Sequence, residues 1–369
     1  MTHCIQASHA RQFAQQVLAR AGVAEGDAAS AADVLLWASL RGVDTHGVRN
    51  LKRYYIDGLT DGTIEPRGEF RIVNETPVTA AVDGGAALGI STAHRAMQLA
   101  IDKADGAGVG IVTVRNSHHL GAAGCYAHQA VEHDMIGACA TGYFFHAGQE
   151  KSVLPFGGLV PMLSTNPLAL ACPSGEMPPF VLDMATSVVP VNRLELLQEL
   201  GRSIPLGWAQ DEQGRSTTDP ADVHKLLPLG GVDELGGHKG FGLSLAVQIL
   251  VGVLSGAWQS GPDPKRVLGD GPPPGDDYAQ EGVSHFCAAV RIDQFGSVDA
   301  FKAGMDALFT TLNNSPPAPG HERVTLPGQR EQEVLKERLQ NGIPLPDVVL
   351  ADLQELSQRF DLPLKVEPV

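Results

Sequence analysis

The sequence predicts an α/β protein, and three observations carry that prediction. Hydrophobic residues make up 43% of the 369-residue chain, enough for a folded core rather than a disordered coil. The 42 glycines and 25 prolines indicate many turns and loops. Short apolar runs typical of buried strands also alternate with segments that repeat at the helical period. A chain of this length is expected to divide into about two or three lobes.

Helical periodicity predicts amphipathic helices, in which apolar residues recur three and four positions apart. They cover residues 8–21, 26–41, 90–106, 298–312, 329–341 and 346–359, with a short helix through Tyr54, Tyr55 and Leu59 and another from Ser187 to Leu200. Apolar runs bounded by turn residues predict strands. These fall at 109–114, 135–141, 160–171, 180–183 and 285–292, and residues 70–83 predict a hairpin.

Residues 240–255 predict a helix of a different character, because they are apolar on all sides. A helix of that kind is expected to be buried. It precedes residues 261–280, whose density of Gly, Pro and Asp predicts a long surface loop.

Charge and hydropathy exclude several classes of protein. The formal net charge is −15 and no run of Lys and Arg exceeds two residues, so nucleic acid is not an expected partner. No apolar run approaches the length that spans a bilayer, and the N-terminus lacks the apolar core of a signal peptide. The five cysteines are odd in number and widely spaced, which predicts reduced thiols and a cytoplasmic location.

The most informative stretch joins a predicted strand to a predicted helix. The apolar run 109–114 ends just before His118 and His119, and a helical pattern begins after Gly121. A helix N-terminus favours anionic ligands, and histidine is well suited to move a proton near neutral pH. One interpretation is a catalytic acid or base beside a bound phosphate or carboxylate. The other is a structural histidine with satisfied hydrogen bonds.

Several familiar motifs do not occur. The glycine spacing in 82–89 and 231–239 departs from the dinucleotide and P-loop fingerprints, and both segments are expected to form turns. The serine-hydrolase pattern G-x-S-x-G is missing. His128 and His133 lie five positions apart on a predicted helix and cannot share a face, so no metal site is expected.

Three further segments end a strand or open a helix with polar groups. STNP at 164–167 follows an apolar run, and its side chains either face a cleft or form a simple turn. DMATS at 183–187 closes another strand, where its polar residues either bind a ligand or cap the next helix. GGHKG at 236–240 opens the apolar helix, where glycines permit close backbone approach and Lys239 offers a positive charge to a phosphate.

Taken together, these segments resemble those of the type-2 malate/L-lactate dehydrogenase family. That family includes ureidoglycolate and sulfolactate dehydrogenases, 2,3-diketogulonate reductase and Δ1-piperideine-2-carboxylate reductase. The resemblance covers nearly the whole chain, in the family's order: DTHGV at 44–48, VRNSHHLG at 114–121, PFGG at 155–158, STNP at 164–167, DMATS at 183–187, IPLGWAQDEQG at 204–214, TTDP at 217–220, LPLGG at 227–231, GGHKGFGL at 236–243 and VTLPGQRE at 324–331.

The resemblance implies a non-Rossmann NAD(P)-binding α/β fold. Its sheet is expected to be largely antiparallel or mixed and flanked by helices, with a helical domain formed from both termini. A homodimer is also implied, and the unusual fold accounts for the missing glycine fingerprint. The implied domains are a helical domain of 1–75 with 313–369, a central α/β domain of 76–120 with 225–312, and a cofactor-binding domain of 121–224.

Carried over by motif, the resemblance also implies roles for residues. His119 transfers the proton in some members and His46, with Thr45, in others, so both stay open here. Five residues are expected to contact the substrate: Tyr54, Thr165, Asn50, Val191 and Asn192. The cofactor is NAD or NADP, and the residues expected to contact it are His119, Leu120, Gly121, Ala122, Ala123, Thr141, Asp183, Met184, Ala185, Lys239, Pro327 and Gly328.

This chain departs from the family pattern at two positions. The pattern has arginine at both of them, and this chain does not. In H-G-V-x-R the arginine position is Asn50, with Arg49 one residue early, and in D-M-A-T-S-x-V-A-R-G the Arg-Gly pair is Val191-Asn192. Neither Asn nor Val supplies the charged, planar fork with which arginine holds a carboxylate. Either another arginine substitutes, or the substrate is not a small 2-hydroxy acid; the candidates are Arg49, Arg53 and Arg193.

The stretch 141–155 is longer than usual for the family, and we expect it to bring Phe144, Phe145 and His146 towards the cofactor. The favoured function is an NAD(P)-dependent oxidoreductase acting on a carbonyl or hydroxy compound other than a simple small 2-hydroxy acid. Two alternatives stay open. One is an imine reductase acting on a cyclic amino acid, and the other is a cofactor-binding protein without dehydrogenase activity.

Overall fold

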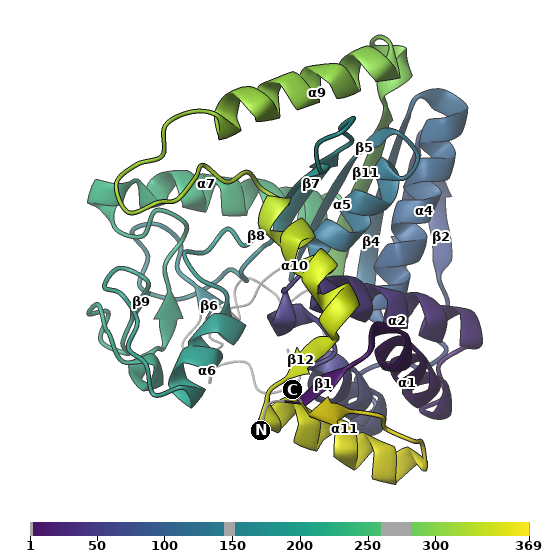
Figure 1. Ribbon diagram of the computed structural model, residues 1–369, viewed down its shortest axis with the longest axis vertical. Helices are drawn as coiled ribbons and strands as arrows, with labels where there is room; N and C mark the ends of the chain where they lie inside the picture. Colours follow the sequence, from purple (N-terminus) through teal and green to yellow (C-terminus); the bar gives the residue numbers. More distant parts are fainter. Residues whose placement is uncertain (1–2, 144–151, 260–281, 369) are drawn as a thin grey trace.

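A computed structural model describes residues 3–143, 152–259 and 282–368. At its centre is a seven-stranded sheet in the order β2-β3-β4-β11-β5-β7-β8 (Figure 1). Among these described strands only β3 and β4 pair in parallel. Because a Rossmann sheet is mostly parallel, the expected non-Rossmann, largely antiparallel fold is confirmed. The strands are β2 (Arg71–Glu75), β3 (Thr79–Asp83), β4 (Val109–Ser117), β5 (Met135–Gly142), β7 (Leu168–Cys172), β8 (Phe180–Met184) and β11 (Val283–Arg291).

Helices cover both faces of this sheet. Helices α4 (Gly89–Ala107) and α5 (Ala123–Val131) pack on one face, where Cys139 of β5 and Cys287 of β11 join the main core. Successive residues of a strand point to opposite faces. Their neighbours Ala140 and Phe286 accordingly pack with Val247 and Val251, from α7 (Gly237–Gln248) and the π-helical turn η5 (Ile249–Val253).

Segments from both ends of the chain gather at one end of the molecule (Figure 1). A small sheet in the order β12-β1-β13 ties the N-terminal strand to two C-terminal ones. The elements there are β1 (His3–Ile5), α1 (Ala7–Arg20), α2 (Glu25–Leu40), α10 (Gln329–Asn341), β12 (Ile343–Leu345), α11 (Asp347–Phe360) and β13 (Glu367–Pro368). The loop after α2 continues through the short helices η1 (Asp44–His46), η2 (Leu51–Ile56) and α3 (Asp57–Asp61), while α9 (Val298–Asn313) lies apart from this group.

A separate lobe has its own small core, to which Val153, Leu163, Leu194, Ile204 and Leu226 contribute. It contains β6 (Ser152–Val153), α6 (Val191–Glu199), β9 (Ala209–Gln210) and β10 (Lys225–Leu226), with the single turns η3 (Pro220–Asp222) and η4 (Asp233–Leu235). Two more turns lie elsewhere, η6 (Ala257–Gln259) and η8 (Ile292–Gln294). The limits of the three domains stay a prediction.

One predicted strand is wrong over most of its length. The prediction covered 160–171, but β7 begins only at Leu168. Pro161 and Pro167 lack the N–H that a strand ladder needs, and Asn166 has a φ of 38°. The segment therefore forms a loop, with an isolated bridge between Val153 and Leu163. The short strands β1, β6, β9, β10, β12 and β13 were not predicted, because two or three residues show no periodicity.

The prediction of a buried helix over 240–255 is also wrong. Helix α7 and η5 cover the sheet with one side only, while Leu245, Ile249 and Val253 on them, and Leu254 and Trp258 just after them, are exposed. An all-apolar pattern does not distinguish a helix that is buried on every side from one with an exposed apolar side. The close backbone approach expected of the glycines does occur, since a Cβ at residue 240 would lie 2.0 Å from the Leu229 carbonyl oxygen.

The other predicted helices, strands and the hairpin are confirmed to within a few residues at each end. The predicted loop 261–280 and the predicted aromatic stretch 144–146 lie outside the described residues. The five cysteines are free thiols, as expected. None of the helices in the described ranges is long and apolar enough to cross a membrane.

Candidate active site

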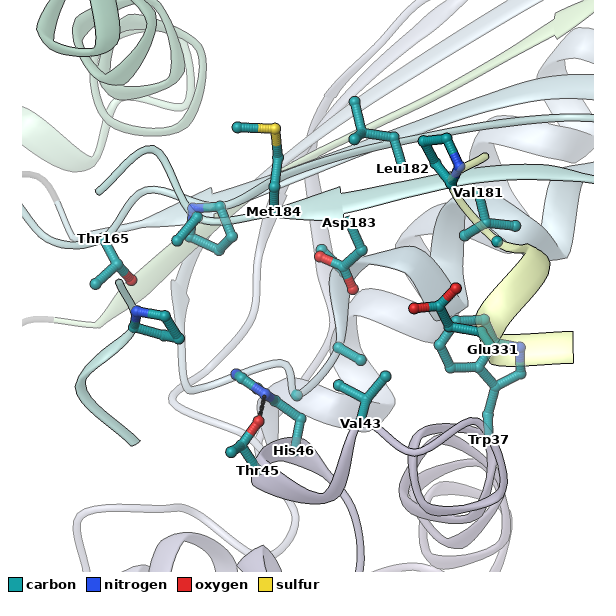
Figure 2. A pocket seen from close by; sticks show the side chains of 18 residues that line it. Trp37, Val43, Thr45, His46, Thr165, Val181, Leu182, Asp183, Met184 and Glu331 are labelled. Atoms are coloured by element: carbon teal, nitrogen blue, oxygen red, sulfur yellow. Dashed lines mark hydrogen bonds between the residues drawn. The ribbon is translucent and has the colours of Figure 1, made fainter. Parts of the chain in front are cut away.

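A cavity of about 310 Å³ lies along β8, facing α5 and the loop that carries η1 (Figure 2). Five consecutive residues of the strand and its exit, 181–185, line it. At about 3.4 Å per residue these four steps make a groove roughly 14 Å long. Asp183 lies at its middle and Glu331 reaches towards it from α10. No other carboxylate, and no Arg or Lys, is among the described residues of the lining.

The cavity brings together many of the residues named from the sequence. Those that line it are Thr45, His46, Gly121, Ala122, Ala123, Thr165, Asp183, Met184, Ala185, Pro327 and Gly328. Others named from the sequence are not among its lining residues: His119, Leu120, Asn50, Tyr54, Thr141, Val191, Asn192 and Lys239. Sequence reasoning missed Trp37, Val43, Pro167, Val181, Leu182, Pro190 and Glu331. Two of these had a signal, because Glu331 ends the segment VTLPGQRE and Pro167 ends STNP.

Asp183 occupies the N-terminus of α5. Its Oδ2 accepts a hydrogen bond of 2.8 Å from the backbone N–H of Gly124. The residue is exposed, because its side chain opens into the cavity. Desolvation raises the pKa of its carboxyl to about 6, with Glu331 adding to the rise and the Gly124 bond opposing it. The sequence predicted that the N-terminus of this helix could bind an anionic ligand. In the structure the Asp183 carboxyl group occupies part of that position.

Three hydrogen bonds hold the η1 loop that carries Thr45 and His46. The Thr45 hydroxyl lies 2.9 Å from His46 Nδ1. The carbonyl oxygen of Thr45 accepts one bond from the Asn50 side-chain amide and one from that of Asn192, each 2.9 Å long. Arg338 of α10 pairs with Asp44 on the other side of the loop. His46 is therefore fixed from the N-terminal region, from α6 and from α10 together.

His119 lies between two aromatic rings just behind this loop. Its ring stacks on Tyr54, with centroids 4.8 Å apart, and on His46, with centroids 5.6 Å apart. Its Nδ1 lies 3.0 Å from the hydroxyl of Tyr55 and accepts a 3.3 Å bond from the backbone N–H of Gly121. The two histidines that the sequence left as alternatives are thus neighbours in one site.

Burial keeps both imidazoles neutral over the ordinary range of pH. Desolvation lowers the pKa of His46 to about 4. The pKa of His119 falls to about 3, first through desolvation and then through the nearby rings of His46 and His285. Neither imidazole behaves as a member of a histidine–carboxylate pair, in which the negative partner raises the pKa of the ring.

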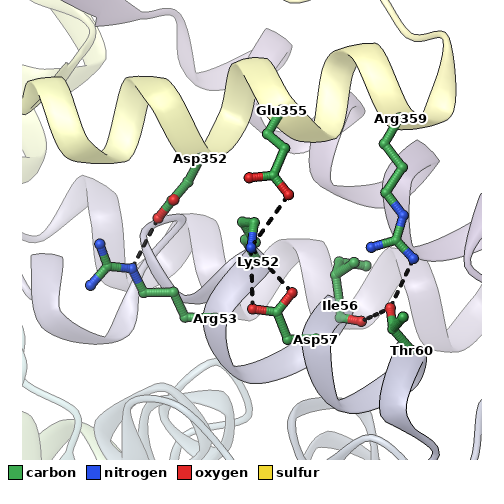
Figure 3. Close-up of polar contacts among 8 residues, drawn as sticks. All are labelled: Lys52, Arg53, Ile56, Asp57, Thr60, Asp352, Glu355 and Arg359. Carbon is green, nitrogen blue, oxygen red and sulfur yellow. Dashed lines mark hydrogen bonds and ion pairs between the residues drawn. The ribbon is translucent and has the colours of Figure 1, made fainter.

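The helix that carries Tyr54 and Tyr55 is held from behind by α11 (Figure 3). Arg53 Nε bonds Asp352 at 2.9 Å, and Lys52 lies between Asp57 and Glu355. These pairs are partly exposed, so each is expected to add little stability. Their main effect is on the orientation of η2, because they hold it with Tyr55 turned inward and fully buried.

A third histidine beneath the site was not predicted. His285 of β11 is fully buried between Ser117 and Thr141. The Thr141 hydroxyl donates to the Ser284 carbonyl, so it accepts from His285 Nδ1, and Ser117 then donates to Nε2. Thr141, which the resemblance places at the cofactor, is buried and occupied by this network.

Gly89 and Asn166 explain how the segments of the site are brought together. A Cβ at Gly89 would lie 1.9 Å from the His118 carbonyl oxygen, so glycine lets the start of α4 approach the turn with both histidines. Asn166 is fully buried, and its amide donates to the carbonyl of Ser244 and to Gln248 Oε1 on α7. That anchor fixes the neighbouring Thr165, whose side chain lines the cavity.

The arginine positions are filled in a way that removes them from the cavity. Asn50 is 1% exposed and bonds Thr45, while Val191 packs against the core of the separate lobe. Of the arginines that could substitute, Arg53 pairs with Asp352. Arg49 borders a different cavity, near β12, of about 140 Å³.

The residues present fit a dinucleotide. The indole Nε1 of Trp37 is a buried donor without a hydrogen-bond partner, and this side chain lines the cavity. Gly121 and Gly328 have φ values of 77° and 92°, and the backbone there borders the cavity without a side chain in the way. Asp183 offers a carboxylate to sugar hydroxyls. Within the described ranges no three His, Cys, Asp or Glu residues are placed to hold a metal ion.

Comparisons with known proteins bear on this geometry. The family model described as "Malate/L-lactate dehydrogenase" matches residues 5–354. A malate dehydrogenase of Pyrococcus abyssi is 41% identical over 351 residues, covering 94% of this chain and 92% of that protein. An L-sulfolactate dehydrogenase of Methanothermobacter thermautotrophicus is 35% identical and covers 96% of each chain. The crystal structure of malate dehydrogenase from Entamoeba histolytica aligns with a TM-score of 0.88, 32% identity and 99% of both chains.

The chain belongs to the malate/L-lactate dehydrogenase family. The resemblance inferred from the sequence is therefore confirmed. The protein is a dehydrogenase or reductase that uses NAD or NADP, and the alternative of a cofactor-binding protein without such activity is set aside.

Proposed function

We propose that this dehydrogenase acts on a carbonyl or hydroxy compound that is larger than malate or lactate, or that carries its charge elsewhere. One observation carries the proposal. Asn50 and Val191 stand at the two positions where the family pattern holds arginine, and the amides of Asn50 and of Asn192, which follows Val191, both bond the Thr45 carbonyl. A side chain engaged in that way offers no charged fork to a substrate carboxylate.

The chemistry divides between the cofactor and the protein. When bound, the nicotinamide supplies or accepts the hydride. The protein's part is to orient the reacting oxygen and to manage its proton, for which His46 and His119 are the candidates, with Thr45 hydrogen-bonded to His46. Tyr54 and Thr165 are proposed to contact the substrate. Asp183, the 121–123 turn and the 327–328 turn are proposed to hold the cofactor, with Lys239 as a candidate for a phosphate.

Malate is the competing substrate, because relatives that are 41% identical carry the name malate dehydrogenase. Steady-state kinetics with NAD and NADP decide between the two. The panel includes malate, lactate, sulfolactate, ureidoglycolate, bulkier 2-hydroxy acids and cyclic imino acids. Efficient turnover of malate, with kcat/KM on the order of 10⁵ M⁻¹s⁻¹ or better, would refute the proposal.

We also propose that the protein is a cytoplasmic homodimer. The exposed apolar surface of α7, η5 and the residues just after them, Leu254 (57% exposed) and Trp258 of η6 (51% exposed), is the proposed contact with a second copy. Light scattering of the purified protein tests this. Replacing Trp258 and Leu254 by Glu should shift the mass towards that of one 38.9 kDa chain.

A further inference from the structure

A buried hydroxyl group faces the inner nitrogen of His119, and neither the substrate nor the cofactor side of the site uses it. Tyr55 is 0% exposed, and its hydroxyl lies 3.0 Å from His119 Nδ1. Burial raises the pKa of this phenol well above its usual value, so it stays a neutral hydroxyl group. It is therefore a permanent hydrogen-bonding partner and not a proton source.

The second partner of His119 Nδ1 decides the direction of both bonds. The backbone N–H of Gly121 points at the same nitrogen from 3.3 Å, and an N–H can only donate. Nδ1 must then be the unprotonated nitrogen, and the Tyr55 hydroxyl donates to it as well. A neutral imidazole with a bare Nδ1 carries its hydrogen on Nε2.

We infer that Tyr55 is a positioning residue that, with the Gly121 N–H, holds His119 as a neutral imidazole with its proton on Nε2. In that state His119 offers a hydrogen-bond donor to a substrate oxygen and no lone pair to act as a base. A neutral donor of this kind stabilises negative charge that develops on a carbonyl oxygen during reduction. This inference rests on the proposed function for the role of His119, but not for its tautomer.

The partners of His46 differ in a way that complements this assignment. Its Nδ1 faces the Thr45 hydroxyl at 2.9 Å, and a hydroxyl group can donate or accept. His46 can therefore hold its hydrogen on either nitrogen, and it lines the cavity directly. The two stacked rings are thus fitted to different tasks, with His119 fixed as a donor and His46 free to exchange between its two neutral tautomers.

The position of Tyr55 is held independently of His119. Helix η2 is fixed to α11 by Arg53 with Asp352 and by Lys52 with Glu355 (Figure 3). The contacts with α11 therefore fix the position of the Tyr55 hydroxyl, and that position does not depend on the orientation of the His119 ring. That is what a device for setting a tautomer requires.

The first test follows the tautomer in the wild-type protein. The protein is labelled with ¹⁵N-histidine, and the ring nitrogens of His119 are assigned by their loss in His119→Asn. We expect a protonated Nε2 and an unprotonated, hydrogen-bonded Nδ1 at neutral pH. A hydrogen on Nδ1 would overturn the inference, whatever the substrate proves to be.

The second test compares two buried tyrosines. Tyr55→Phe removes only the hydroxyl at His119, whereas Tyr126→Phe removes one that donates to the carbonyls of Leu120 and Ile90. For Tyr55→Phe we expect kcat on the best substrate to fall about ten- to a hundredfold, with cofactor affinity within about twofold. The ¹⁵N signal of Nδ1 should also move. Tyr126→Phe should change neither kcat nor that signal.

The outcomes separate this inference from the proposed function. If His119→Asn abolishes turnover while Tyr55→Phe keeps wild-type kcat and an unchanged Nδ1 signal, Tyr55 only packs and the inference fails. If malate proves to be the best substrate, the proposed substrate class fails, while the signal of Nδ1 still decides the tautomer. Thermal unfolding of both variants shows whether a loss of activity reflects a loss of fold.

Discussion

The two walls of the cavity differ in how they use their polar groups. The wall built from β8, α5 and α10 turns its groups into the cavity, with Asp183 and Glu331 both facing it (Figure 2). On the opposite side Thr45 and His46 of the η1 loop line the cavity, while Asn50 and Asn192, which do not line it, both bond the Thr45 carbonyl from behind. Under the proposed function, the difference teaches that the side assigned to the cofactor keeps its family motifs, whereas the side assigned to the substrate lacks both family arginines and has internal hydrogen bonds there.

The largest expected effect falls where the two walls meet. We expect His119→Ala to lower kcat by about 10² to 10⁴, because under the proposed function His119 acts on the reacting oxygen of the substrate. Cofactor affinity should stay nearly unchanged, measured as the dissociation constant for NADH or NADPH. If His46→Ala is the damaging substitution and His119→Ala is nearly silent, then the role proposed for His119 is wrong.

The next effect concerns the substrate wall alone. Losing a charge-assisted hydrogen bond costs about 1.5–3 kcal/mol, or roughly ten- to a hundredfold in affinity. Malate and lactate should therefore be turned over at least that much more slowly than the best substrate of the panel. Comparable kcat/KM values for all of them would show that a different cation holds the carboxylate.

A smaller effect is expected on the cofactor wall. Asp183→Asn keeps an oxygen that can accept from the Gly124 N–H but removes the charge and the second acceptor proposed to face the cofactor, so we expect cofactor affinity to fall about tenfold. The pKa of Asp183 is raised to about 6, so its carboxylate form is lost as pH falls through that value. Titration calorimetry should then show wild-type binding weakening below pH 6, and binding by the variant should lack this change.

The same residue gives a stability test of opposite sign. A carboxyl group with a raised pKa in the folded state binds more protons there than in the unfolded chain between about pH 4 and pH 6. Its contribution therefore destabilises the fold progressively as pH rises through this window. We expect Asp183→Asn to have a higher melting temperature than the wild type at pH 8, but not at pH 4.

The smallest effect is expected from Asn192→Ala. This substitution removes the bond to the Thr45 carbonyl and the bond that Tyr54 donates to Asn192 Oδ1 at 3.0 Å. We expect KM for the substrate to rise a few-fold and unfolding free energy to fall by about 1–2 kcal/mol. Asn50→Ala serves as the matched control, because it removes only a bond to Thr45. An Asn192 variant with wild-type KM would separate α6 from substrate binding.

Local sequence patterns determined much of the fold and many members of the site. Periodicity alone located α1, α2, α4 and most of the central strands, because each repeat records which side of an element is covered. Strand ends, which are local features of the chain, also marked His119 and Asp183, whereas Pro327-Gly328 came from the family resemblance. Elements of two or three residues, and the loop before Leu168, carried no such signal.

Tertiary structure alone decided what each polar group faces. Nothing in the order of residues shows that Tyr55 meets His119 across 64 positions, or that Asn192 meets Thr45 across 147. It also decided that Ile249 and Val253 of η5, and Leu254 and Trp258 after it, are exposed. The physical reason is that the periodicity of apolar residues is set within a single helix or strand. A hydrogen bond between distant residues, or a covered surface, depends on how two elements pack together. The sequence by itself determined the family, the elements and the candidate histidines, and the packing of η2, α5 and α6 decided their protonation states and partners.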